Sequence, residues 1–367
     1  MPLSPVFRAV SFRDMPGWAA DEHSRSFAAF RRSALQSQVK PYRTGALGIA
    51  REAFAKAFDE ARGIEALDDP VARDFFERHF VPAHIPAESG DHGFVTGFYE
   101  PEVEASPERT ERFKVPLLSR PADLAEIDDA SRPAGMDPCL AFGRRAGDRL
   151  EEYFDRRAIE QGALARQGLE LAWLADKVDA FFIHVQGAAR LRMADGRLRR
   201  VTYAAKSGQN FSGPGRILAN LGEIPLEKVT MQSIRAWFSA NPHRIDEILW
   251  QNRSYIFFRE TPLGDPALGP VAAAKVQLTQ GRSIAVDRLL HTFATPFFID
   301  APSLTAFGGA PFRRLMIAQD TGSAIVGRAR GDLFAGSGDA AGEVAGVVRH
   351  AADFYALVPR PLVTGMA

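Results

Sequence analysis

The sequence has few of the residues that build disulfides and metal sites. Its 367 residues contain one cysteine, Cys139, so no disulfide can form within the chain and no thiol-rich metal site exists. The eight histidines include no HExxH motif or other close metal-binding spacing. The sequence therefore predicts no metal ion and makes a zinc enzyme a poor hypothesis. Cys139 is expected to be a small buried hydrophobic residue.

An excess of charge of one sign is also absent. Lysine plus arginine and aspartate plus glutamate both number 45, so the formal net charge is zero. A neutral chain has no general attraction to nucleic acid or to an anionic membrane surface, and its partner is expected to be neutral or mixed in charge. Neither a phosphate-binding GxxxxGK[ST] motif nor a dinucleotide-binding GxGxxG motif occurs. We therefore expect no cofactor and no nucleic acid partner.

Long apolar runs are missing as well. The first 30 residues hold no apolar core of the length that a signal peptide needs, and no lipid-attachment cysteine follows them. No later stretch approaches the ~20 apolar residues of a membrane span. We expect a soluble globular protein with no signal peptide, lipid anchor or transmembrane segment in the given sequence. Its length predicts about two domains.

Phenylalanine, by contrast, is abundant, with 27 residues against 6 tyrosines and 4 tryptophans. A phenylalanine ring has no polar group, so most of these rings are expected in the core. In the first ninety residues, Phe54 and Phe58 share one helical stripe, and Phe75 and Phe76 follow Pro70 at a predicted helix start. This part of the chain is therefore predicted to be helical.

Along the rest of the chain, the sequence predicts strands mixed with helices, then short helices, and then β structure again. We expect a strand entering a loop at Pro101, a loop over residues 117–142 and a helix over 156–178. The sequence predicts two strands over residues 181–193 and 197–208. They are joined at Asp195 and Gly196, and Asp-Gly between two such runs is a strong hairpin signal. Short helices follow, and β structure resumes near Ser254. Domain boundaries are therefore predicted near Pro101 and near Ser254.

Residues 313–338 hold the most suggestive pattern of the chain. An apolar strand ends at Asp320, and Gly322, Gly327 and Asp332 follow in a segment rich in small residues. Glycines permit sharp turns and close backbone approach, so this segment could hold a sugar or peptide chain near Asp320. Alternatively, Asp320 simply accepts backbone hydrogen bonds in a turn and Asp332 is solvated.

Two other places offer hydrogen-bonding side chains. Thr96 and Tyr99 lie in a strand-like segment, and Gln186, Tyr203 and Lys206 lie at the end of the predicted hairpin among small residues. An amide, a phenol and an ammonium group together suit the hydroxyl and acetamido groups of a sugar. The alternative is that these side chains only form a solvated strand surface.

Seven motifs, in order along the chain, resemble the membrane-bound lytic murein transglycosylase A family. They are GFYEP (97–101), VQG (185–187), YAAKSGQN (203–210), MQSIRAWF (231–238), NRSYIFF (252–258), AVDR (285–288) and QDTGSAIVGRARGDLFAGSG (319–338). The match runs from about residue 93 to the C-terminus, and seven ordered motifs are far more specific than one. The last domain of the family is named for three aspartates, matched here by Asp287, Asp320 and Asp332.

The resemblance implies a fold that is mainly β with peripheral helices. Residues 1–100 and 255–367 would form a double-psi β-barrel catalytic domain with the N-terminal helices. Residues 101–254 would form an inserted β-rich domain, and a groove between the two would take a glycan strand of peptidoglycan. The resemblance also implies the periplasm or cell envelope as location. The sequence itself identifies no partner among proteins of cell-wall synthesis or hydrolysis.

The implied reaction is non-hydrolytic cleavage of the bond between N-acetylmuramic acid and N-acetylglucosamine, leaving a 1,6-anhydromuramoyl end. Asp320 matches the general acid and base of the family, with Asp332 and Asp287 as supports that tune or orient it. The implied substrate-binding residues are Thr96, Gly97, Tyr99, Gln186, Lys206 and Gly322. Two alternatives stay open: a peptidoglycan hydrolase that uses two carboxylates, and a glycan-binding module that does not cut.

Overall fold

The chain folds into two compact units, and the second is inserted into the sequence of the first. The structure is a computed structural model that describes residues 2–363 except 89, 129 and 139, so Cys139 lies outside the described residues. One unit joins Met1–Tyr99 to Gly264–Ala367, and the other is Glu100–Leu263. The fold consists mostly of sheet with some helices, as predicted.

The first unit is built on an eight-stranded sheet. Its strands are β1 (Arg8–Ala9), β2 (Phe80–Ile85), β3 (Gly93–Glu100), β13 (Ser283–Val286), β14 (Pro296–Ala301), β15 (Phe312–Asp320), β16 (Arg330–Ser337) and β17 (Arg349–Pro359). They follow the order β1-β2-β17-β14-β15-β13-β16-β3, and β17 also pairs with β3. Six strands, from β17 through β14, β15, β13 and β16 to β3, therefore close into a ring.

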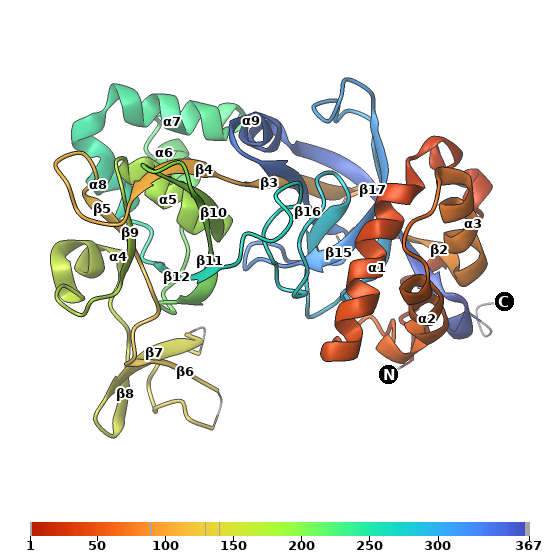
Figure 1. Ribbon diagram of the computed structural model, residues 1–367, viewed down its shortest axis with the longest axis horizontal. Helices are drawn as coiled ribbons and strands as arrows, with labels where there is room; N and C mark the ends of the chain where they lie inside the picture. The colour runs from red at the N-terminus through yellow and green to blue at the C-terminus, as the bar shows by residue number, and fades with distance from the viewer. Residues whose placement is uncertain (1, 89, 129, 139, 364–367) are drawn as a thin grey trace. The chain divides into compact units, whose positions relative to one another are not determined.

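Helices from the start of the chain cover part of this unit (Figure 1). They are α1 (His23–Val39), α2 (Ala55–Gly63) and α3 (Asp69–His79), and α9 (Asp339–Val347) follows β16. Helix α3 begins where the side chain of Asp68 accepts a hydrogen bond from the amide of Val71, with proline in its first turn. The predicted phenylalanine stripes are confirmed as core, because Phe54, Phe58 and Phe75 are buried.

The second unit holds a six-stranded sheet and a smaller one. The large sheet has the order β12 (Ile256–Thr261), β11 (Leu198–Lys206), β10 (Ala188–Met193), β4 (Glu102–Ser106), β9 (Glu170–Leu174) and β5 (Val115–Leu118). The small sheet has the order β6 (Leu124–Glu126), β7 (Phe142–Ala146) and β8 (Arg149–Glu151). The helices are α4 (Arg156–Ala158), α5 (Lys177–Gln186), α6 (Pro214–Asn220), α7 (Met231–Ala240) and α8 (Ile245–Leu249). The predicted hairpin turn is confirmed, because β10 and β11 are antiparallel neighbours on either side of Gly196.

Several predictions for this unit were wrong. Residues 181–186 belong to helix α5, because Asp176 caps its start and Gly187, with φ of 76°, ends it. The helix predicted over 156–178 ends early, since Gly162 has a non-helical backbone and β9 follows. The stretch 117–142 is not a continuous loop, because it contains the end of β5, β6 and the start of β7.

The second division between the units also lies later than the predicted boundary near Ser254. It falls between Leu263 and Gly264, after strand β12. The reason is that β12 pairs along β11, so its backbone hydrogen bonds hold it in the second unit. Within the described part of the chain, no helix has the length and apolar character needed to cross a membrane.

Candidate active site

Asp320 is the last residue of strand β15 in the first unit. A backbone turn approaches it from residues 272–276: the amide of Ala273 donates to Oδ1 of Asp320 over 3.2 Å, and the amide of Ala274 donates to the carbonyl of Gln319 over 3.0 Å. The carboxylate thus stands at a strand end, as predicted, with a neighbouring turn fixed against it.

The surroundings of Asp320 favour its protonated form. Burial of the carboxyl raises its pKa to about 6, well above its ordinary value. The backbone amides of Thr321 and Ala273 act in the opposite direction, because they stabilise the ionised form. The negative charge of Asp332 raises the pKa further, and the positive charge of Lys275 lowers it. At neutral pH a small but usable fraction of Asp320 therefore carries a proton.

Asp332 lies in β16 and is held by two residues. The hydroxyl of Thr96, in β3, donates to Oδ1 of Asp332 over 2.5 Å, and Nη2 of Arg330 donates to that hydroxyl over 2.7 Å. Burial raises the pKa of Asp332, while the Thr96 hydrogen bond and the charge of Arg330 lower it. Asp332 is therefore a second carboxyl in a poorly hydrated place, with one defined donor.

Strand β13 brings the two aspartates to the same level of the sheet. It lies between β15 and β16, parallel to the first and antiparallel to the second. Ala285 is the register partner of Asp320 on one side and of Asp332 on the other. Two strand spacings separate the two backbones, roughly 10 Å. The register between β13 and β15 shifts by one residue between Ile284 and Ala285, so the strand alternation is interrupted next to Asp320. The charge of Asp332 nevertheless acts on the carboxyl of Asp320.

Asp287 follows β13 directly but serves a different purpose. Its Oδ1 accepts a hydrogen bond from the amide of Leu289 over 3.0 Å, and its Oδ2 accepts one from the amide of Gly327 over 3.1 Å. The residue is 8% exposed. Gly327 has φ of 116°, in the region that favours glycine. Asp287 thus fixes the segment between Asp320 and Asp332 to the end of β13.

The substrate-binding residues predicted in the first unit differ in their surroundings. Thr96 contacts Asp332, as described above. Gly97 packs closely on α9, where a Cβ atom would lie 2.9 Å from Cα of Ala345. Tyr99 is buried beside Gly342 of the same helix. Gly322 is exposed, and its carbonyl accepts from the amide of Ile325 over 3.0 Å.

The other two predicted residues belong to the second unit. Gln186 is the last residue of α5, and Lys206 is the last residue of β11; both are partly exposed. The amide of Tyr203 donates to the carbonyl of Gly187, the residue after Gln186, over 2.7 Å, while Lys206 pairs with Ile256 of β12. Gln186, Tyr203 and Lys206 all belong to the second unit, and their grouping in a binding site stays a prediction.

Sequence reasoning missed three contributors to the aspartate site. Ala273 supplies only its backbone amide, which no side-chain pattern reveals. Lys275 acts on Asp320 through its charge and has φ of 63°, an unusual conformation for a non-glycine residue. Arg330 was within the GRARGD stretch, so its place two positions before Asp332 was the one signal available.

Comparisons with known proteins match both parts of the chain. The family model described as the MltA specific insert domain matches residues 94–259, and that of the 3D domain matches residues 282–358. The second range includes all three aspartates. A crystal structure of a membrane-bound lytic murein transglycosylase from Agrobacterium tumefaciens is 49% identical, with a TM-score of 0.91 over 97% of this chain and 98% of that chain. This chain belongs to the MltA family.

Other MltA proteins agree with this assignment. The structure of MltA from Neisseria gonorrhoeae is 31% identical, with a TM-score of 0.80 over 96% of this chain and 92% of that chain. The membrane-bound lytic murein transglycosylase A of Vibrio cholerae is 31% identical over 261 residues, which are 70% of this chain and 62% of that protein. The match thus spans less than two thirds of the length of that relative. The family resemblance predicted from the seven motifs is confirmed.

Proposed function

We propose that this protein is a lytic transglycosylase of peptidoglycan. It cleaves the β-1,4 bond between N-acetylmuramic acid and N-acetylglucosamine without consuming water, and leaves a 1,6-anhydromuramoyl end. One observation carries the proposal: Asp320 stands at a strand end, with its pKa raised to about 6 by burial. Relatives of this chain are named lytic murein transglycosylases, which supports the substrate.

The first step needs an acid. The glycosidic oxygen is a poor leaving group, so it must gain a proton as its bond to C1 of the muramoyl residue breaks. An aspartate with the ordinary pKa of about 3.9 would hold almost no proton near neutrality. Burial raises the pKa of Asp320 to about 6, so that part of it is protonated near neutrality. The proton of Asp320 passes to the leaving oxygen, and positive charge develops at C1.

The second step needs a base, and the same carboxylate supplies it. Asp320, now ionised, accepts the proton of the muramoyl 6-hydroxyl as that oxygen forms a bond to C1. One bond to C1 breaks and another forms, and Asp320 returns to its protonated state. No water enters the products, so a second catalytic carboxylate is not required.

Asp332 and Asp287 are positioning residues in this scheme. The negative charge of Asp332 raises the pKa of Asp320, which keeps the acid in its protonated form. Asp287 holds the amides of Leu289 and Gly327, and so fixes the segment that follows Asp320. Neither residue transfers a proton in the proposed reaction.

The finer architecture remains part of the proposal. The closed ring of six strands in the first unit supports a double-psi β-barrel, and the second unit would be the inserted domain. The groove for the glycan strand, and the roles of Thr96, Gly97, Tyr99, Gln186, Lys206 and Gly322 in binding it, stay predictions from the family resemblance. The cell envelope is the proposed location, in keeping with relatives that are named membrane-bound.

The competing reaction is hydrolysis by two carboxylates, for which Asp332 beside Asp320 is the supporting observation. Digestion of purified sacculi followed by mass spectrometry of the soluble products separates the two. Anhydro products lack one water relative to hydrolysis products, and we expect them to dominate. Products that carry mainly reducing ends would contradict the proposed mechanism and favour the hydrolase. Binding without any soluble product would favour a glycan-binding module.

A further inference from the structure

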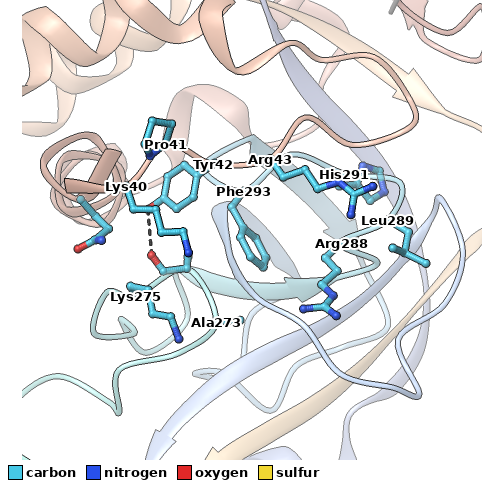
Figure 2. Close-up of a pocket in the computed structure, with 12 residues that line it drawn as sticks. Lys40, Pro41, Tyr42, Arg43, Ala273, Lys275, Arg288, Leu289, His291 and Phe293 are labelled. Carbon is cyan, nitrogen blue, oxygen red and sulfur yellow. Dashed lines mark hydrogen bonds between the residues drawn. The ribbon is translucent and has the colours of Figure 1, made fainter. Parts of the chain in front are cut away.

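The first unit contains a second feature, a pocket of about 330 Å³ close to Asp320. It lies between the end of α1, the turn at residues 273–275 and the segment that follows β13 (Figure 2). Ala273, whose amide donates to Asp320, is one of the lining residues. One lining residue of the pocket is therefore hydrogen-bonded to the proposed acid.

The pocket wall is strongly basic. Lys40, Arg43, Lys275 and Arg288 line it, and its described lining includes no aspartate or glutamate. Figure 2 shows these four side chains around the rings of Tyr42 and Phe293. None of the four forms an ion pair with a described residue, although many other arginines of the chain do. In a chain of zero net charge, this is a local concentration of unpaired cations.

His291 is a buried, neutral residue of the same wall. It is 4% exposed, and its Nε2 lies 2.9 Å from the carbonyl of Arg328. A carbonyl can only accept, so Nε2 carries the proton. Burial lowers the pKa of His291 to about 4, so the ring is neutral and Nδ1 is an acceptor. Nδ1 has no hydrogen-bond partner among the described residues, which is unusual for a buried polar atom.

We propose that this pocket binds a carboxylate group of the peptide that the glycan strand carries next to the bond that is cut. The proposal rests on the proposed function. In a strand that carries peptides, the lactyl carboxyl group of N-acetylmuramic acid is bound in the amide to the peptide, so the peptide is where that strand offers carboxylates to four cations. The volume is at the lower end of ligand pockets, which are typically about 300–1,000 Å³, and suits one acidic side chain with its adjoining amides.

The test compares glycan strands that carry peptides with strands from which an amidase has removed them and whose freed lactyl carboxyl groups have then been capped as methylamides. The variant is the double substitution Lys40→Ala and Arg43→Ala, because both residues are exposed and lie in the pocket wall farthest in sequence from the aspartates. The matched control is Arg8→Ala with Lys56→Ala, which removes two exposed cations of the same unit outside the pocket. The ratio of kcat/KM for peptide-bearing strands to that for peptide-free strands is measured for each protein.

We expect the wild type and the control to prefer peptide-bearing strands. The pocket variant should lose about three- to tenfold of that preference. The loss is modest because exposed ion pairs are individually weak. The loss should appear in KM, and added salt should reduce the preference of the wild type in the same way. An equal kcat/KM for both substrates in the wild type, or an equal loss in variant and control, would overturn the proposal. Anhydro products from peptide-free strands would still support the proposed reaction in that event, so the two failures are distinguishable.

Discussion

Thr96 donates a hydrogen bond of 2.5 Å to the carboxylate of Asp332, although 236 positions separate the two residues in the chain. Arg330 donates to the same hydroxyl oxygen over 2.7 Å. The hydroxyl therefore links a guanidinium group to a carboxylate. Burial raises the pKa of Asp332, and a residue far from it in sequence thus lowers that pKa through one hydrogen bond.

Thr96→Val is expected to disturb this link. The substitution removes the hydroxyl and leaves the buried carboxyl without its donor, so the pKa of Asp332 rises further. We expect a loss of stability of about 1–3 kcal/mol, typical of an unmade buried hydrogen bond, measured by chemical denaturation. Thr96→Ser keeps the hydroxyl and should retain the stability and the pH profile. If serine fails to rescue, the threonine methyl group matters rather than the hydrogen bond.

Asp320→Asn is expected to abolish the release of soluble fragments from sacculi while leaving binding to them intact. The amide cannot donate a proton as an acid and cannot accept one as a base. General acid and base catalysis contributes about 10²–10⁴-fold each, so kcat should fall by at least that range. Asp74→Asn, on the exposed face of α3, is the control. Undiminished turnover by Asp320→Asn would refute the assignment.

The same substitution is expected to stabilise the fold at alkaline pH. The folded-state pKa of Asp320, about 6, lies above the unfolded value of about 3.9, so ionisation costs stability as pH rises between these values. The cost is complete above about pH 6 and absent below about pH 4. Asp320→Asn avoids this cost. Its free energy of unfolding at pH 8 should exceed that of the wild type by on the order of 1–3 kcal/mol. A denaturation series from pH 4 to pH 8 checks this, and a pH-independent difference would contradict it.

Asp332→Asn is expected to move the pH profile of the reaction. In the wild type, kcat/KM should decrease as pH rises through about 6, because Asp320 loses its proton there. Removal of the negative charge at position 332 lowers the pKa of Asp320, so this decrease should shift to lower pH. The amide oxygen can still accept from Thr96. An unchanged profile with reduced kcat would instead give Asp332 a direct part in the reaction.

Asp287→Ala is expected to loosen the segment between the two other aspartates. The amide of Gly327 is buried and would lose its acceptor, at a cost of about 1–3 kcal/mol. Hydrogen exchange at residues 326–328 should accelerate, and kcat should fall while the products stay anhydro forms. Asp287→Asn keeps one acceptor oxygen and should show a smaller effect. A change from anhydro to reducing ends would show that Asp287 takes part in the chemistry.

Much of the local structure could be predicted from the sequence because local rules govern it. The strand that ends at Asp320, the hairpin at Asp195 and Gly196, and the buried phenylalanine stripes follow from hydrophobic periodicity and turn chemistry. The same rules failed at residues 181–186. An apolar run of that length suits a strand or a helix, and the caps at Asp176 and Gly187 decided for the helix.

The sequence by itself determined the family, the strand-end aspartate and the elements whose side chains repeat with a regular period. Only the tertiary structure decided how Asp320 is protonated. Ala273 lies 47 positions away from Asp320, and Thr96 lies 236 positions from Asp332. The basic pocket likewise joins the end of α1 to turns far along the chain. Burial and long-range contact set a pKa and build a pocket, and a local pattern of residues contains neither.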